Sequence, residues 1–325
     1  MSGTDFGIVV ASSNAKVGIA DAIAVLRDGG SALDAALAGI RPVEANPADH
    51  TVGFSGLPNL LGEVELDASV MEGTGLRAGA VGALHGYQDA ADLARVVMEE
   101  LPHVLIAGPG TERLAAEAGF TPRDLLTPEV EEIWRNGLAG HDTGVYAERG
   151  GYLNKIRSIV TQTATDPEKA IPGAEEPPHG TVNVIARDRF GHIACVVSTS
   201  GWAWKYPGRL GDSPVIGAGN YADDRWGAAA CTGRGEMAQR CLTAHSVVTF
   251  MRFGMSLDEA LKTAMNDLVH LDDPWKSEMN IVALDRDGNP GAASTAIGKT
   301  FIFQRTDMAE HEEPERTHVS VKGAS

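Results

Sequence analysis

Gly180 and Thr181 lie where a polar stretch of the chain meets an apolar, strand-like run that begins Thr-Val-Asn-Val-Ile-Ala. A threonine hydroxyl is a weak nucleophile that needs a nearby base. If the peptide bond between these two residues is cut, Thr181 acquires a free α-amino group beside its own hydroxyl. An α-amine, with a pKa of about 7.7–8.0, acts as a general base near neutral pH. Thr181 would then supply both nucleophile and base. An intact junction would be an ordinary entry into a strand, which the local sequence alone favours because such junctions are common.

Three other patterns suggest chemistry and are rejected on their context. Residues 103–119 have the pattern of a strand, Gly-Pro-Gly and a helix, but Arg113 stands where a dinucleotide fingerprint needs its third glycine. Residues 211–214, Gly-Asp-Ser-Pro, match an esterase nucleophile block but lie in mid-chain. The Asp-Asp-Pro at 272–274 offers no histidine at the spacing such an enzyme needs. The histidines lack i, i+4 partners, so no metal site is predicted.

The composition narrows the class of protein. The chain has 325 residues, with 44 acidic and 27 basic side chains and a net charge of −17, which argues against a nucleic-acid partner. No apolar run approaches the roughly 20 residues that span a bilayer, and the first residues lack the basic and apolar regions of a secretory signal. Three cysteines without a paired spacing favour a reducing compartment. We therefore expect a cytoplasmic protein without a membrane partner.

The first part of the chain alternates between strand-like and helix-like spacing of apolar residues. Ser31 precedes a helical run and is followed three residues later by Asp34, which predicts an N-cap. The elements expected here are strands at 6–13, 61–73 and 103–108 and helices at 16–30, 32–44, 90–101 and 111–120, with one short helix within 121–137.

The second part begins after a linker at 161–180, which is polar and contains four of the 16 prolines. A hairpin is predicted for 181–199, followed by a glycine-rich region at 208–235 without an assigned element. Further on, the sequence predicts a helix at 241–253, a helix opened by a Ser256–Glu259 capping box, a hairpin at 279–297, and a disordered tail at 307–325. This order of elements favours an α+β or layered sandwich fold over strict βα alternation.

Several motifs in this second part occur together and in a fixed order. They are Gly-Thr-Val at 180–182, Ser-Thr-Ser-Gly at 198–201, Gly-Arg-Leu-Gly-Asp-Ser-Pro at 208–214, Gly-Ala-Gly-Asn-Tyr-Ala-Asp at 217–223 and Ala-Cys-Thr-Gly-Arg-Gly-Glu at 230–236. With them the chain resembles the N-terminal-nucleophile (Ntn) hydrolases of the glycosylasparaginase and plant-type asparaginase (isoaspartyl peptidase) family, over most of residues 7–303. The resemblance implies a single domain over 1–325 with a four-layer αββα sandwich. It also implies autocatalytic cleavage into fragments 1–180 and 181–325.

The resemblance assigns Gly180, Thr181 and Thr51 to self-cleavage. The Thr181 hydroxyl attacks the preceding carbonyl, an N→O acyl shift gives an ester, and water hydrolyses that ester. A glycine at position 180 permits strained geometry and leaves the carbonyl unshielded. Thr51 matches a hydroxyl residue that assists this processing.

The remaining site residues are also implied by the resemblance. Arg209 would hold a substrate α-carboxylate in a bidentate contact and Asp212 the α-ammonium, a suitable clamp for a free amino-acid head. Thr232 and Gly233 would stabilise the oxyanion through a hydroxyl and a main-chain N–H. Thr199 would hydrogen-bond near the nucleophile. An exposed Arg–Asp pair and a strand-end threonine are the alternatives that the local sequence leaves open.

The implied reaction is hydrolysis of the side-chain amide of an asparagine derivative, without a cofactor, by a homodimer of cleaved units. Residues 51–63 and the acidic linker match glycosylasparaginases, which favours N4-(β-N-acetylglucosaminyl)-L-asparagine as the substrate. Gly180 matches the isoaspartyl peptidase/L-asparaginase branch, the alternative function. Ser13 stands about where glycosylasparaginases carry a tryptophan. A non-catalytic amino-acid-binding protein is the alternative from another class.

Overall fold

Two β-sheets form the centre of the computed structural model, which describes residues 6–136, 180–273 and 276–320. The seven-stranded sheet has the order β11-β1-β5-β6-β2-β3-β4 and the five-stranded sheet has the order β12-β10-β9-β8-β7. The strands of the first sheet, in that order, are Phe301–Arg305, Ile8–Ser12, Val182–Arg187, Ile193–Thr199, Leu66–Glu72, Arg77–Leu84 and Leu105–Ala107. Those of the second are Thr317–His318, Pro290–Ser294, Met279–Asp285, Gly227–Gly233 and Asn220–Asp223.

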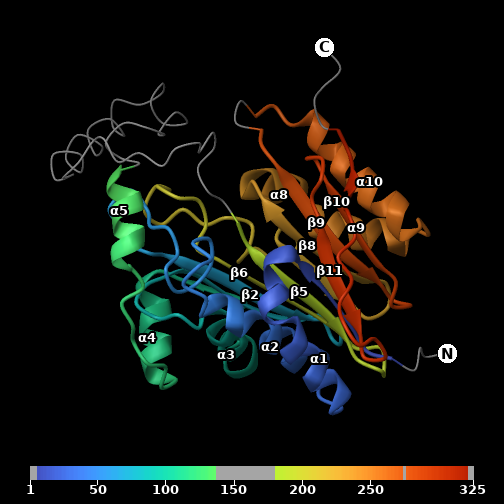
Figure 1. Cartoon of the computed structure of the whole chain (residues 1–325), viewed down its shortest axis with the longest axis horizontal. Helices are drawn as coiled ribbons and strands as arrows, with labels where there is room; N and C mark the ends of the chain where they lie inside the picture. The colour runs from blue at the N-terminus through green and yellow to red at the C-terminus, as the bar shows by residue number, and fades with distance from the viewer. Residues whose placement is uncertain (1–5, 137–179, 274–275, 321–325) are drawn as a thin grey trace.

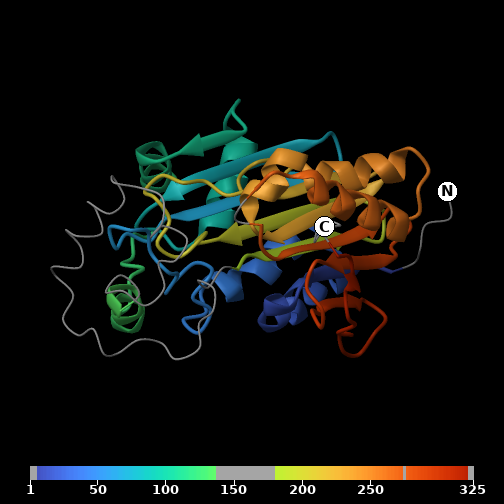
Figure 2. The ribbon, with the colours of Figure 1, turned by 90° about the horizontal axis from the view of Figure 1, so that it is seen from above.

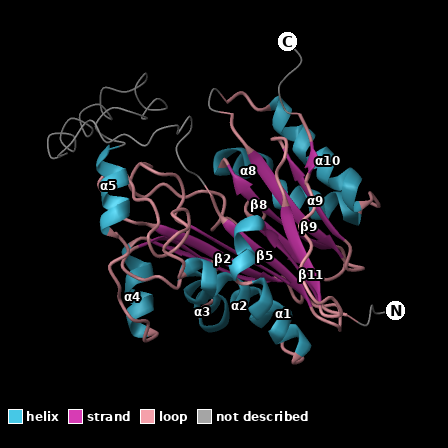
Figure 3. Cartoon of the chain, viewed as in Figure 1, coloured by secondary structure: helices cyan, strands magenta, loops and turns pink. Residues whose placement is uncertain are grey.

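Helices cover each sheet on one side (Figures 1 and 3). The seven-stranded sheet packs against α1, α2 and α3, and the five-stranded sheet packs against α9 and α10, with α8 preceding α9. The α-helices are α1 (Ile19–Arg27), α2 (Ala32–Glu44), α3 (Ala90–Glu100), α4 (Pro109–Glu117), α5 (Pro128–Asn136), α8 (Gly235–Cys241), α9 (Thr243–Arg252) and α10 (Leu257–Asp267). None of the described helices is long and apolar enough to cross a membrane.

Side-chain alternation on the strands builds the cores. On β5, Val184 belongs to the cluster beneath α1–α3, whereas Ile185 belongs to a cluster shared with the other sheet. On β8, Ala229 faces the cluster under α9 and α10, and Ala230 faces β5 and β6 of the first sheet. Both strands are therefore apolar on both faces, as expected where successive side chains point in opposite directions. The expectation of a mixed α and β protein is confirmed.

Local signals placed most elements correctly. The Ser31 hydroxyl accepts a hydrogen bond from the Asp34 N–H at 3.1 Å, and the Ser256–Glu259 capping box is present at the start of α10. Sequence patterns missed β7 and β8, which lie in the glycine-rich region at 208–235. Alanine and glycine have little intrinsic strand preference, so pairing with β9 decides the conformation of β8.

The expected disordered tail is a wrong prediction for residues 307–320. Within this segment β12 pairs in parallel with β10, and Val319 is 9% exposed in the cluster under α9 and α10. Glu312 and Phe303 exchange two backbone hydrogen bonds, and Glu313 forms an ion pair with Lys16. In Figure 2 the red C-terminal segment lies beside the blue N-terminal helices. Further backbone hydrogen bonds join the segment to the second sheet and the first, from the Val319 N–H to the Ser294 carbonyl and from the Phe301 N–H to the Pro314 carbonyl. The linker predicted at 161–180 lies outside the described residues except for Gly180.

Deletion of residues 307–325 should lower the urea midpoint of unfolding. Burial of Val319 alone contributes about 1.5–3 kcal/mol, and the hydrogen bonds to β10 and β11 are lost with it. Urea denaturation followed by circular dichroism measures the change. Lys16→Ala, which removes only an exposed ion pair with the same segment, should have little effect. An unchanged midpoint in the deletion variant would show that the segment does not contribute to stability.

Candidate active site

Thr181 precedes β5, which pairs with β1 on one side and β6 on the other. In the β5–β6 register Val182 lies opposite Ser198, so Thr181 and Thr199 become neighbours at the end of the hairpin. The carbonyl oxygen of Gly180 accepts a hydrogen bond from Thr181 Oγ1 at 2.8 Å and another from Thr199 Oγ1 at 2.7 Å. The Gly201 N–H donates to Thr199 Oγ1 at 2.9 Å. The Gly180 carbonyl is thus polarised by two hydroxyls.

Thr51 packs directly against Gly180. A Cβ at position 180 would lie 2.4 Å from Thr51 Oγ1 and 2.7 Å from Thr51 Cβ, so a larger residue would fit here only if Thr51 moved. Thr51 Oγ1 donates to Asp49 Oδ1 at 2.5 Å, and Asn14 Nδ2 donates to the other Asp49 oxygen at 2.9 Å. Asp49 therefore positions the threonine that contacts the Gly180–Thr181 junction. No motif in the sequence marks Asp49.

Thr232 and Gly233 end β8 of the other sheet. Thr232 is 7% exposed and lies opposite Asn280 of β9. Gly233 has φ 114°, and a Cβ there would lie 2.2 Å from the Glu278 carbonyl oxygen, so the position requires glycine. Both residues line a cavity of about 480 Å³ together with Thr181.

The cavity combines several of the predicted residues in one place. Thr51, Gly180, Thr181, Thr232 and Gly233 all line it, as do Asp49 and Ser13. Ser13, in the 3-10 helix η1 (Ser13–Val17), places a small polar side chain on this wall. Thr199 reaches the same junction through its bond to the Gly180 carbonyl. Two strand ends and two loops therefore meet around the Gly180–Thr181 bond.

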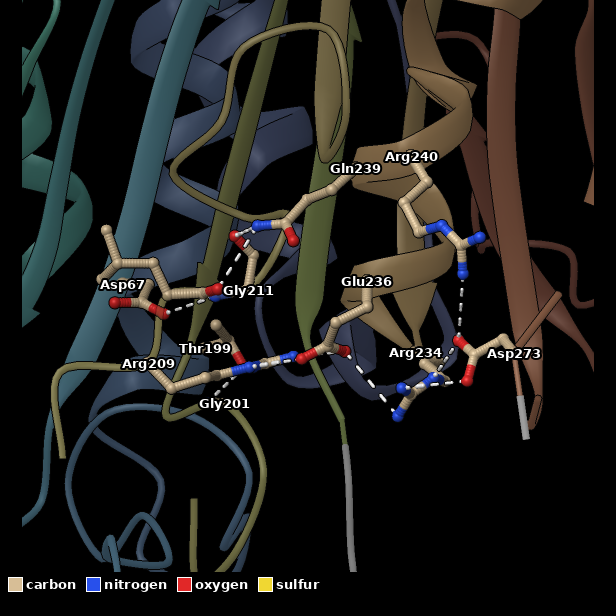
Figure 4. A network of polar contacts seen from close by, with 11 residues as sticks. Asp67, Thr199, Gly201, Arg209, Gly211, Arg234, Glu236, Gln239, Arg240 and Asp273 are labelled. Atoms are coloured by element: carbon tan, nitrogen blue, oxygen red, sulfur yellow. Dashed lines mark hydrogen bonds and ion pairs between the residues drawn. The ribbon is translucent and has the colours of Figure 1, made fainter. Parts of the chain in front are cut away.

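Arg209 and Asp212 lie beside this cavity without lining it. Arg209 Nε and Nη2 each donate to Glu236 at 2.9 Å, a bidentate contact visible in Figure 4. Arg209 Nη2 and Asp212 Oδ1 both approach Gly235, two residues after Gly233. Gly201, which bonds Thr199, is also close to the Arg209 guanidinium. The predicted head-group clamp is therefore adjacent to the Thr181 junction.

Asp212 is a buried carboxyl. It is 4% exposed, and its Oδ2 has no hydrogen-bond partner among the described residues. Burial raises the pKa of Asp212 to about 7, although the charge of Arg209 acts in the opposite direction. An ammonium ion brought next to this carboxyl would stabilise its ionised form.

A charged network supports the loop that carries Arg209. Arg234 Nε contacts Asp273 at 3.1 Å, and Gln239 Nε2 donates to the Gly211 carbonyl at 2.7 Å (Figure 4). On the other side Lys205 is 1% exposed and donates to the Glu65 carbonyl at 3.0 Å. The described residues contain no cluster of three or more His, Cys, Asp or Glu side chains suited to a metal ion.

Residues 9–312 match the sequence profile of a protein family described as asparaginase. The chain belongs to the asparaginase family. The resemblance seen in the motifs is confirmed, and the matched range includes every predicted site residue.

Among curated relatives in this family, an N(4)-(Beta-N-acetylglucosaminyl)-L-asparaginase of Elizabethkingia miricola is 34% identical over 85% of this chain and 75% of its own length. The mouse N(4)-(beta-N-acetylglucosaminyl)-L-asparaginase is 38% identical over 70% of this chain and 67% of its own length. A probable isoaspartyl peptidase/L-asparaginase of Arabidopsis thaliana is 31% identical over 86% of this chain and 82% of its own length. The relatives therefore include proteins named for both branches that the motifs resemble, glycosylasparaginase and isoaspartyl peptidase/L-asparaginase.

Asp212→Asn should flatten the dependence of stability on pH. The folded-state pKa of Asp212, about 7, lies above the ordinary value of 3.8, so the folded protein retains a proton that the unfolded chain releases. This contribution is complete below pH 4 and is lost as pH rises to about 7, by up to roughly 4 kcal/mol. Urea unfolding of both proteins at pH 4.5, 6 and 8 gives the difference in slope. Asp258→Asn, at an exposed position of α10, is the control. Parallel curves for wild type and Asp212→Asn would contradict the assignment.

Proposed function

We propose that this member of the asparaginase family is an autoprocessing amidohydrolase with Thr181 as its N-terminal nucleophile. It cleaves the side-chain amide of asparagine derivatives, with N4-(β-N-acetylglucosaminyl)-L-asparagine as the first substrate to test, and releases aspartate. The observation that carries the proposal is the Gly180 carbonyl, hydrogen-bonded by the hydroxyls of Thr181 and Thr199 in a cavity shared with Thr232 and Gly233. The names of the relatives support the substrate class.

Self-cleavage would begin at the polarised carbonyl. Thr181 Oγ1 attacks the Gly180 carbonyl carbon, and the Thr199 hydroxyl stabilises the charge that develops on the oxygen. The Gly180–Thr181 peptide C–N bond breaks, and the Thr181 nitrogen takes up the proton that the Thr181 hydroxyl loses. An ester then joins Gly180 to Thr181 Oγ1. Water hydrolyses this ester, leaving a carboxylate on Gly180 and a free amine on Thr181. The Asp49–Thr51 pair supports the geometry by holding Thr51 against Gly180.

The processed site would then act on the substrate. The Thr181 amine accepts the proton of its own hydroxyl, and Oγ1 attacks the β-carbonyl carbon of the substrate. The Thr232 hydroxyl and the Gly233 N–H stabilise the oxyanion. The Thr181 ammonium then gives its proton to the leaving nitrogen, the substrate C–N bond breaks, and the amine departs. Water hydrolyses the resulting β-aspartyl ester. The bidentate contact of Arg209 with Glu236 supports the proposed clamp. A substrate carboxylate has the same two-oxygen geometry as the Glu236 side chain and would take its place on Arg209.

The wider properties follow from the same proposal. We propose that the two sheets with helices on their outer sides are the four-layer αββα sandwich of Ntn hydrolases, in one domain of two fragments, 1–180 and 181–325. A cytoplasmic homodimer of cleaved units that works without a cofactor remains part of the proposal. An isoaspartyl peptidase/L-asparaginase activity is the second candidate, favoured by the cationic side chains of the cavity described below and by the Arabidopsis relative's name.

Thr181→Ala should yield a single uncleaved chain without amidase activity, because both the attacking hydroxyl and the later nucleophile are lost. Wild type should give two fragments, the second beginning at Thr181. Intact mass and aspartate release measure both effects. Thr181→Ser, which keeps a hydroxyl, should still cleave. Normal cleavage of Thr181→Ala would refute Thr181 as the nucleophile. A wild-type chain that stays whole on prolonged incubation would favour the non-catalytic amino-acid-binding alternative.

Arg209→Ala should raise KM by roughly 10–100-fold, since a bidentate charge-assisted contact with the substrate carboxylate is lost. Self-cleavage should continue, because Arg209 does not touch the Gly180–Thr181 bond. Steady-state kinetics and intact mass separate the two effects. Arg240→Ala is the control, since Arg240 is a half-exposed member of the same network and contacts Asp273 at 3.8 Å. An unchanged KM in Arg209→Ala would remove Arg209 from the substrate site.

A further inference from the structure

The Thr181 cavity has a cationic wall that no motif predicted. Arg316, from the segment that precedes β12, lines the cavity and is 9% exposed. Its Nε donates to the Thr300 carbonyl at 2.8 Å and its Nη1 to the Ile281 carbonyl at 3.2 Å. Among the described residues no carboxylate lies within ion-pair distance of it. The side chain is thus positioned by neutral groups that leave its charge unbalanced.

A buried guanidinium without a carboxylate is unfavourable, because carbonyl oxygens replace water without neutralising the charge. Burial lowers the pKa of Arg316 to about 10, and the nearby charge of Glu278 only partly opposes this. Glu278 is itself paired with Lys299 at 2.8 Å on the same wall. The fourth charged side chain of the cavity, Asp49, accepts hydrogen bonds from Thr51 and Asn14. An anion entering beside Arg316 would therefore be attracted.

Asn280 provides a second unsatisfied group at the same place. It is 8% exposed and lies opposite Thr232 in the β8–β9 register. Its Nδ2 donates to Glu278 at 2.7 Å, whereas its Oδ1 has no hydrogen-bond partner among the described residues. The neighbouring residue, Ile281, holds the Arg316 guanidinium through its carbonyl. Among the described residues, the cavity wall next to Thr232 thus combines an amide oxygen without a hydrogen-bond donor and a guanidinium without a carboxylate partner.

We propose that Arg316 and Asn280, with Lys299 neutralising Glu278, form a leaving-group subsite that selects amides whose leaving amine carries a carboxylate next to the scissile nitrogen. The inference rests on the proposed amidohydrolase function. In a bound β-aspartyl dipeptide the carboxylate of the second residue would face Arg316, and the leaving amine would lie along the wall that Asn280 and Arg316 share. Thr232 lies opposite Asn280, and Arg316 binds the carbonyl of the next residue, Ile281, so the proposed oxyanion donor and the guanidinium belong to the same wall of the cavity.

The test compares two substrates that differ only in this carboxylate, β-aspartyl-leucine and β-aspartyl-leucinamide, with asparagine as reference. Aspartate release by the processed wild-type enzyme should give a kcat/KM at least about tenfold higher for the acid, the effect of one charge-assisted contact. Arg316→Gln should bring this ratio close to one. Arg27→Gln is the matched control, because Arg27 also binds backbone carbonyls of the C-terminal segment, those of Thr306 and Met308, but outside the cavity.

Lys299→Met is the second variant in case Arg316→Gln does not fold. Lys299 is half-exposed, and its loss leaves Glu278 unneutralised beside the subsite, so the acid-to-amide ratio should also fall. Equal kcat/KM for acid and amide in a wild type that hydrolyses asparagine would overturn the subsite and leave the proposed function standing. An unchanged ratio in folded Arg316→Gln or in Lys299→Met would overturn it as well. Failure of the wild type on all three substrates and on N4-(β-N-acetylglucosaminyl)-L-asparagine would instead refute the amidohydrolase.

Discussion

The carbonyl oxygen of Gly180 accepts hydrogen bonds from Thr181 and Thr199, and the rest of the site depends on this pair of contacts. They exist because β5 and β6 form an antiparallel hairpin whose register brings the two threonines together. A slip of one residue would turn every side chain of β5 to the opposite face and would exchange Val184 with Ile185 between two cores. Packing of both faces of β5 therefore fixes the geometry of the hydroxyls.

The second sheet contributes a complementary set of groups. Thr232 and Gly233 end β8, and α8 follows at once, so the strand end and the first turn of the helix approach the hairpin together. Glu236 in that first turn binds Arg209, so the residue proposed to hold the substrate carboxylate stays next to the strand end. The cavity consequently has donors for an oxyanion on one strand and charged groups on adjoining loops. The first sheet supplies the Gly180–Thr181 junction and the second supplies Thr232 and Gly233, so the cavity exists only where the two sheets meet.

Much of this arrangement was visible in the sequence. The Ser31 and Ser256 caps and the 181–199 hairpin follow from local chemistry, whereas the motifs around Gly180 pointed to the site through their resemblance to a family. The motif around 230–236 already contained Glu236, whose position in sequence gave no reason to pair it with Arg209. Asp49 and Asn280 were missed because single polar residues in loops and strands have no local signature. The strand β8 was missed because its alanines fit a sheet only when β9 lies beside it.

The sequence by itself determined which residues have the chemistry: a threonine after a glycine, a threonine–glycine pair, and an arginine three residues before an aspartate. These residue types are visible in the sequence, but their proposed roles came from the resemblance of the motifs to a family, because the local sequence alone favours an ordinary strand entry at Gly180–Thr181. The tertiary structure alone decided that Thr51 packs on Gly180, that Asp212 is buried with an unsatisfied oxygen, and that the C-terminal segment brings Arg316 into the cavity. These features depend on contacts between residues more than 100 positions apart, or on burial that only the packed sheets create. The tail at 307–325 was expected to be disordered, but pairing with β10 and β11, distant in sequence or decided by packing, orders residues 307–320.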